Sequence, residues 1–199
     1  MAAERPGYVT KELAAETLKD FEELFERRPA PGAFRCWCMY HQEAKPGEAD
    51  LEHPRGNQTV GNRERKRDLV KKGRSHGIVV YWEGRPVGWC QFGLMDELPR
   101  FDGIRGYRRP DSEGGRRQLW RITCFTVDRR YRERRIASAG LAAALDSIRT
   151  MGGGIVEAYP IVRWGAYREY LGTASMFRKK GFDVVGKFGR NNVVMRRTL

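Results

Sequence analysis

The chain has 199 residues, of which 40% are hydrophobic and 32% charged, a balance typical of one globular domain rather than a disordered or membrane-spanning chain. No apolar run approaches the roughly 20 residues of a membrane helix, and the first residues lack the apolar core of a signal peptide, which together predict a cytoplasmic protein without membrane contact. The net charge of +13 fits a nucleic acid partner, a small polyanion or no function at all, and does not choose among them.

Residues 1–56 are expected to contain an amino-terminal helix, a first strand and a loop. Apolar residues at helical spacing predict the helix over residues 10–28, with Thr10 as its N-cap. Alternating apolar residues predict a strand over residues 33–41. A polar segment rich in Gly and Pro predicts the loop from Gln42 to about Gly56.

Residues 57–199 are expected to form the core of the same domain. A basic helix is predicted near residues 62–73, followed by a β-hairpin over residues 76–94 whose turn is Glu83-Gly84-Arg85-Pro86. A long loop, residues 95–117, leads to a strand over residues 118–127.

The carboxyl-terminal half continues with a helix over residues 136–151, which has an apolar stripe, and a strand over residues 154–161. A short helix follows over residues 173–181, with Thr173 as its N-cap, and a hairpin over residues 182–199 ends the chain. This order of elements predicts a mixed α/β fold in a single domain, residues 1–199, without internal repeats.

The stretch VDRRYRERRIASAG, residues 127–140, places five arginines where a strand is predicted to give way to a helix. A helix start presents unpaired N–H groups and a partial positive charge, so such corners bind phosphate groups readily. Arginines add charge-assisted hydrogen bonds. The pattern therefore predicts a pyrophosphate site, and the alternative is a solvated basic helix start.

The segment ITCFTVDRRYRERRIASAGLAAALDSI resembles the acyl-coenzyme-A-binding segment of the GNAT superfamily of N-acetyltransferases, in which a strand leads through Arg/Gln-x-x-Gly-x-Gly/Ala into a helix. Arg132 matches the first position of that motif and Ala137 the last, whereas Arg135 replaces the first glycine. The segment GTASMFRKKGF is similar to the late helix of the family. Phe177 stands there where many members carry the tyrosine proposed to protonate the leaving thiolate, a role that phenylalanine cannot perform.

The resemblance implies a twisted mixed sheet of about six or seven strands flanked by helices, and transfer of an acetyl group from acetyl-coenzyme A to a primary amine by direct attack, without a metal. It implies that backbone groups of the strand hold the pantetheine arm, that the corner holds the pyrophosphate, and that the late helix lines the far side of the arm. The residues expected to contact coenzyme A are Phe125, Thr126, Val127, Arg130, Arg132, Arg134, Arg135, Ile136, Ala137, Ser138, Thr173, Ser175 and Phe177.

Glu157, on the strand expected beside the cofactor strand, is the candidate general base, and Tyr159 falls two residues later on the same face. The alternative is that Glu157 is a surface or salt-bridged strand residue. Arginines of the loop 95–117 favour an acceptor amine with acidic groups, either a small molecule or a peptide. Proteins that resemble this one are frequently homodimers, which leaves a dimer open.

Two other functions compete with the transferase. The basic segments near residues 62–74 and 100–117 would suit nucleic acid phosphates, although no nucleic acid module is visible. A non-catalytic protein that binds acyl-coenzyme A is the other alternative, since Arg135 and Phe177 depart from the family pattern.

A metal site is not expected. Cys36, Cys38 and His41 suggest zinc ligands, but the second paired motif of a structural zinc site is missing. The four cysteines are expected to be reduced thiols, with Cys36 and Cys38 as small apolar residues of a strand. Cys124 is not expected to be a nucleophile, because no histidine is near it in the sequence.

Overall fold

The computed structural model describes residues 7–27, 36–43, 55–104, 106–110, 117–161, 169–188 and 192–199, with residues 55–60, 169 and 188 described by their backbone alone. A seven-stranded sheet has the order β1-β2-β3-β4-β5-β7-β6. Only β4 and β5 run parallel, and every other neighbouring pair of these strands is antiparallel. The strands are β1 (Tyr8–Glu12), β2 (His76–Trp82), β3 (Arg85–Leu94), β4 (Leu119–Val127), β5 (Ile155–Ala158), β6 (Asp183–Phe188) and β7 (Asn192–Thr198).

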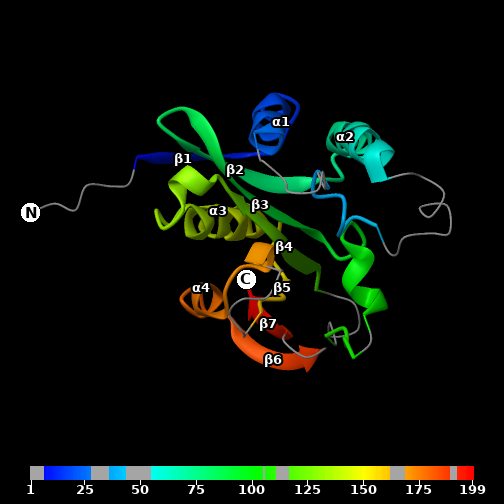
Figure 1. Ribbon diagram of the computed structural model, residues 1–199. Helices are drawn as coiled ribbons and strands as arrows, with labels where there is room; N and C mark the ends of the chain where they lie inside the picture. Colours follow the sequence, from blue (N-terminus) through cyan, green and yellow to red (C-terminus); the bar gives the residue numbers. More distant parts are fainter. Residues whose placement is uncertain are drawn as a thin grey trace, which may run out of the picture.

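Helices cover both faces of this sheet (Figure 1). The helices are α1 (Leu18–Glu26), α2 (Arg55–Lys71), α3 (Ile136–Thr150) and α4 (Ala174–Arg178). Ile78 and Val80 of β2 pack on the side of α3 and α4, whereas Val79 and Tyr81 pack on the side of α1. Burial of both faces explains why β2 is almost continuously apolar. The predicted mixed α/β fold is confirmed.

A close contact fixes α3 against the sheet. A Cβ atom on Gly88 of β3 would lie 2.3 Å from Cγ2 of Ile136, the first residue of α3. A Cβ atom on Gly140, one turn further along α3, would lie 3.0 Å from the Cβ of Cys90. Glycine therefore lets the start of α3 lie directly on β3, beside the end of β4.

A β-bulge interrupts the pairing of β4 with β3 on one side of β4. On the other side, β4 separates early from β5, which leaves that edge without a described partner strand. Gln91 and Phe92 of β3 pair with Cys124 and Ile122, which leaves Thr123 as an extra residue. On the other side, the pairing of β4 with β5 ends at Ile122↔Ala158. No strand of the described chain pairs with residues 123–127 on that side, so this edge is free to hydrogen-bond a ligand.

Two predictions for the amino-terminal region were wrong. Thr10, the predicted N-cap, and the two residues after it belong to strand β1, because they pair with the edge of β2, and the helix begins at Leu18 after Thr17. Residues 36–43, the described part of the predicted strand 33–41 and of the loop after it, form turns. Trp37 and Cys38 have φ angles of 48° and 53°, a left-handed conformation that a strand cannot contain.

The other predicted elements agree with the structure where it describes them. The basic helix is longer than predicted, since α2 already begins at Arg55. Both hairpins form, although the turn near Gly189 lies outside the described residues. Thr173 caps α4 by accepting a hydrogen bond from the N–H of Met176. The loop 95–117 contains a short 3-10 helix, η2 (Pro99–Gly103). None of the described helices is long and apolar enough to cross a lipid bilayer.

Candidate functional site

The corner between β4 and α3 is a structured turn. Asp128 follows β4 and accepts a hydrogen bond from the N–H of Arg130 at 3.0 Å, which starts a short 3-10 helix, η3 (Arg129–Tyr131). Glu133 and Arg135 then take left-handed conformations, with φ angles of 64° and 58°. The chain thereby reverses within a few residues and enters α3.

Arg135, which stands where the family motif has a glycine, takes a left-handed backbone conformation that glycine adopts readily. It is the N-cap of α3 with φ 58° and ψ 18°, and its side chain is exposed and makes no capping hydrogen bond. The next three N–H groups, of Ile136, Ala137 and Ser138, belong to the first helical turn, where a helix supplies no acceptor for them. The corner therefore offers N–H groups and the positive end of a helix to an anion.

The arginines of the corner do not all remain available to that anion. Arg130 pairs with Asp128 at 2.8 Å, and the guanidinium of Arg134 lies 5.2 Å from the centre of the Trp82 ring and 5.6 Å from that of Tyr131. Arg132 and Arg135 are exposed, and neither is recorded in an ion pair within the described residues. Of the predicted pyrophosphate ligands, these two are the best placed to meet a phosphate.

The free edge of β4 and the start of α4 lie on either side of the expected cofactor arm. Phe125 and Thr126 are almost fully buried, and the Oγ1 atom of Thr126 is buried without a hydrogen-bond partner. The hydroxyls of Thr173 and Ser175 lie 3.1 Å apart and both residues are exposed. An unsatisfied hydroxyl beside an unpaired strand edge fits a ligand rich in amide groups.

Phe177 is a core residue in this structure. Its side chain is fully buried, with ring centres 6.0 Å from Phe125 and 5.2 Å from Phe182. A bound ligand would therefore touch Phe125 rather than Phe177. At the start of α4, the exposed hydroxyls of Thr173 and Ser175 remain for the ligand.

Glu157 lies in a buried hydrogen-bond network at the carboxyl end of β5. Its side chain is fully buried, and its Oε1 atom accepts a hydrogen bond from Arg196 at 2.6 Å. Its Oε2 atom accepts two more, from the hydroxyls of Tyr107 at 2.5 Å and Tyr159 at 2.7 Å. Glu157 and Tyr159, which were expected on the same face, are joined by a hydrogen bond, and the alternative of a salt-bridged residue describes the contact of Glu157 with Arg196.

Arg121 of β4 joins this network to the loop that precedes β4. It is fully buried and donates to both carboxylate oxygens of Asp102 in η2, at 3.0 and 2.6 Å, and to the Tyr107 hydroxyl at 3.1 Å. It also donates to the carbonyl of Leu98 at 2.7 Å. Burial raises the pKa of Tyr107, so its phenol stays protonated near neutral pH.

Sequence reasoning missed four members of this network, which are Asp102, Tyr107, Arg121 and Arg196. One signal was present, since a lone arginine in the apolar run QLWRITCFTV is rare unless the arginine is paired. The β4–β5 register pairs Arg121 with Glu157, and about 20 Å of strand separates Arg121 from Val127 at the corner. An extended ligand along β4 would thus reach from the corner to the network.

The cysteines form a thiol cluster, with the Sγ atoms of Cys38 and Cys124 3.4 Å apart. Cys38 is buried within a turn and accepts a hydrogen bond from the Trp89 indole. In the part of the chain that the structure describes, no three His, Cys, Asp or Glu side chains are arranged to hold a metal ion.

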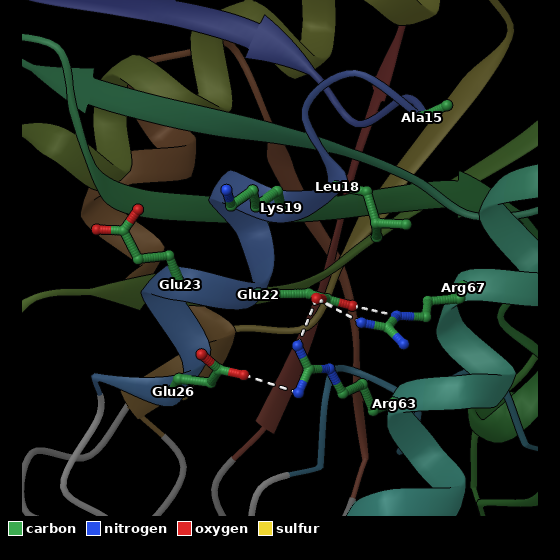
Figure 2. A pocket seen from close by; sticks show the side chains of 8 residues that line it. All are labelled: Ala15, Leu18, Lys19, Glu22, Glu23, Glu26, Arg63 and Arg67. Carbon is green, nitrogen blue, oxygen red and sulfur yellow. Dashed lines mark hydrogen bonds and ion pairs between the residues drawn. The ribbon is translucent and has the colours of Figure 1, made fainter.

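A depression of about 540 Å³ separates α1 from α2, and Figure 2 shows ion pairs across it. Arg63 and Arg67 of α2 both reach Glu22 of α1, at 2.5 Å in each case, and Arg63 also reaches Glu26. Arg65 pairs with Glu43. Much of the positive charge that suggested a nucleic acid partner is therefore engaged within the protein.

We expect these ion pairs to make stability depend on acid pH. Hydrogen bonds from Arg67, with further ones from Arg63, lower the pKa of Glu22 to about 2. Because the folded-state pKa is depressed, the stabilisation is complete above the unfolded pKa, near 4.5, and is lost as pH falls toward 2. The difference in unfolding free energy between the wild type and Glu22→Gln should narrow by about 3 kcal/mol from about pH 6 to about pH 2.

Urea unfolding across this pH range measures that difference. Glu23→Gln is the matched control, because Glu23 is half exposed on the same helix and pairs with Arg27 at 3.5 Å. An equal pH dependence for the two variants would contradict the prediction.

An edge of β4 without a described partner strand thus leads into a helix start whose first N–H groups have no acceptor within the helix. The sequence profile of the acetyltransferase (GNAT) family matches residues 37–182. The chain belongs to the GNAT family of acetyltransferases. No curated protein sequence matches it.

Solved structures with similar folds share little sequence with the chain. Ribosomal-protein-S5-alanine acetyltransferase from Vibrio fischeri has a TM-score of 0.54 and 14% identity, over 98% of this chain and 95% of the other. An N-acetyltransferase from Staphylococcus aureus has a TM-score of 0.53 and 15% identity, over 96% of this chain and 97% of the other. Arabidopsis thaliana NAA60, solved in complex with acetyl-CoA, has a TM-score of 0.52 and 14% identity, over 96% of this chain and 98% of the other.

Proposed function

We propose that this protein is an N-acetyltransferase that transfers the acetyl group of acetyl-coenzyme A to a primary amine. The observation that carries the proposal is the corner, where Arg135 takes a left-handed backbone conformation and its side chain is exposed. The N–H groups of the first turn of α3 remain available to a pyrophosphate. Membership of the family and the similar fold of NAA60, which was solved with acetyl-CoA, support the same ligand.

The free edge of β4 suggests how the rest of coenzyme A would be held. Backbone groups of residues 125–127 would hydrogen-bond the pantetheine arm, and the hydroxyls of Thr173 and Ser175 would line its other side. When bound, acetyl-coenzyme A supplies an activated acyl carbon, so the protein needs no nucleophile of its own. Its residues need only position the amine and accept its proton.

Glu157 is proposed as the group that finally accepts this proton. The register of β4 and β5 places it beside Arg121, just before the two strands separate. Near it, Arg108 is exposed and its carbonyl accepts a hydrogen bond from Arg196, and the charge of Arg108 favours an acceptor with carboxylate groups. The V. fischeri neighbour is named for a protein acceptor, which adds peptide amines to the candidates. A homodimer and a cytoplasmic location stay predictions from the sequence.

Thermal unfolding with acetyl-coenzyme A, coenzyme A or a short oligonucleotide, at matched ionic strength, tests the proposal. A ligand at a hundred times its dissociation constant adds about 2.7 kcal/mol. Stabilisation by both coenzyme A species, and release of free thiol with an amine, would support the transferase. The amines to compare are spermidine, an aminoglycoside, and peptides that begin with Glu, Ala or Lys.

The other outcomes separate the alternatives. Binding of coenzyme A without transfer to any of these amines would favour a non-catalytic binding protein. A salt-sensitive shift with the oligonucleotide alone would favour nucleic acid binding.

Arg132→Ala is expected to weaken coenzyme A binding about tenfold or more, because a hydrogen bond to a charged group contributes about 1.5–3 kcal/mol. Arg149→Ala is the matched control, since it removes the same charge from the other end of α3, where Arg149 pairs with Asp146. Isothermal titration calorimetry measures both affinities. Equal losses in the two variants would mean that only the overall charge attracts the ligand.

A further inference from the structure

Glu157 cannot meet an acceptor amine directly in this structure. Its side chain is 0% exposed, and both of its oxygens already accept hydrogen bonds from within the protein. A proton that leaves the amine must therefore reach this carboxylate through another residue. The two candidates are the phenols that donate to Oε2, those of Tyr107 and Tyr159.

Only one of these phenols lies partly at the surface. Tyr159 is 0% exposed and packs between other side chains, with its ring centre 3.5 Å from that of Phe101. Tyr107 is only half-buried. Of the two phenols, only that of Tyr107 therefore belongs to a side chain that solvent reaches.

The hydroxyl of Tyr107 is oriented to pass a proton inward. It donates to Glu157 Oε2 at 2.5 Å and accepts from Arg121 at 3.1 Å. A phenol oxygen has one proton and two acceptor positions, so one position remains for an N–H group of the acceptor. Because the Tyr107 proton points to Glu157, the oxygen can accept a second proton as it gives up the first.

The position of this hydroxyl is fixed by neighbours on both sides. Asp102, in the same loop, is held by two hydrogen bonds from the buried Arg121. The Tyr107 ring lies against Tyr159, with ring centres 6.0 Å apart, and the Arg121 guanidinium lies 5.4 Å from the Tyr107 ring centre. A proton-transfer group needs such fixed geometry, since transfer requires hydrogen-bond distances.

We propose that Tyr107 is the residue through which the acceptor amine passes its proton to Glu157, a role that rests on the proposed transferase function. As the amine nitrogen bonds to the acyl carbon, its N–H becomes acidic. That proton moves to the Tyr107 oxygen while the Tyr107 proton moves to Glu157 Oε2. The carbon–sulfur bond breaks with its electron pair on sulfur, and the proton on Glu157 returns by the same path, so that coenzyme A leaves as a thiol and Glu157 is again a carboxylate.

Tyr107→Phe and Tyr159→Phe form a matched pair, because each removes one phenol hydroxyl from the same carboxylate oxygen. We expect Tyr107→Phe to lower kcat by about a hundredfold and to change its pH dependence. Tyr159→Phe should lower kcat by less than about tenfold, because Tyr159 supports the carboxylate and does not take the proton from the amine. KM for acetyl-coenzyme A should be unchanged in both. The acceptor is the amine acetylated fastest by the wild type in the comparison above.

A second readout does not depend on turnover. Protein labelled with 3-fluorotyrosine is observed by fluorine NMR in the presence of coenzyme A, and the resonances absent from each variant assign Tyr107 and Tyr159. Addition of the amine should shift the Tyr107 resonance and leave that of Tyr159 in place. This shift is measured on the wild type, so a loss of stability in either variant does not affect it.

The outcomes distinguish this proposal from the one on which it rests. Equal losses of kcat in the two variants, or an unshifted Tyr107 resonance, would overturn the relay while leaving an active transferase. A wild type that binds coenzyme A but acetylates none of the amines would overturn the transferase, and the relay with it.

Discussion

Glu157→Gln is expected to lower kcat by about a hundredfold or more while leaving the affinity for coenzyme A unchanged. Glutamine has nearly the same size and retains one carbonyl oxygen for hydrogen bonds, but it cannot take up a proton as a carboxylate does. The corner that is proposed to bind the pyrophosphate lies about 20 Å further along β4. Steady-state kinetics and calorimetry on the same preparations measure both quantities.

Glu97→Gln is the control for this prediction. Glu97 is another buried carboxylate, with a side chain 7% exposed, and it pairs with His76 and the N–H of Leu94. Its loss should lower stability without a comparable loss of kcat. If Glu157→Gln retains wild-type turnover, Glu157 is a structural residue and the proton leaves by another route.

Arg121→Leu is expected to lower the unfolding free energy by about 3–5 kcal/mol, the usual effect of removing one partner of a buried ion pair. The Asp102 carboxylate would lose its two bonds from Arg121, and the carbonyl of Leu98 would lose its donor. Asp102 would keep only its exposed partner Arg109, at 2.9 Å, so the loss of its buried partner is the largest of these costs. Urea unfolding measures the effect, with equal m-values as the check that both proteins unfold in the same way.

A double variant separates the ion pair from the packing. Arg121→Leu combined with Asp102→Leu removes both charges, and well-packed apolar replacements of buried pairs are often neutral. We therefore expect it to recover most of the lost stability. If Arg121→Leu alone lowers the unfolding free energy by less than about 1 kcal/mol, the ion pair contributes no more than an exposed one does. That result would contradict the burial of this network.

The sequence was most informative where a local rule determines structure. The hairpin of β2 and β3 followed from its turn residues, and the cap at Thr173 followed from the capping preference of threonine. The corner at residues 128–136 was found from its arginines and from a family motif that spans only a few residues. At Arg135, which departs from the motif, the backbone takes the left-handed conformation that glycine favours.

Predictions failed where distant residues decided the structure. Residues 8–12 became a strand because the edge of β2, about 70 residues later, was available to pair with them. Cys36–His41 had the alternation of a strand, yet left-handed turns at Trp37 and Cys38 bury three consecutive side chains against α1 and β3.

The sequence by itself thus determined the mixed α/β class, and it pointed to the corner after β4 and to Glu157 with Tyr159 as candidate sites, since each depends on residues close together in the chain. Only the tertiary structure brought Asp102, Tyr107, Arg121 and Arg196 to Glu157. These residues come from a loop and three strands, and their charges are tolerated in the interior only because they meet and satisfy one another. No local sequence pattern predicts that these side chains contact one another, because their contacts depend on the register of the sheet and on the path of the loop above it.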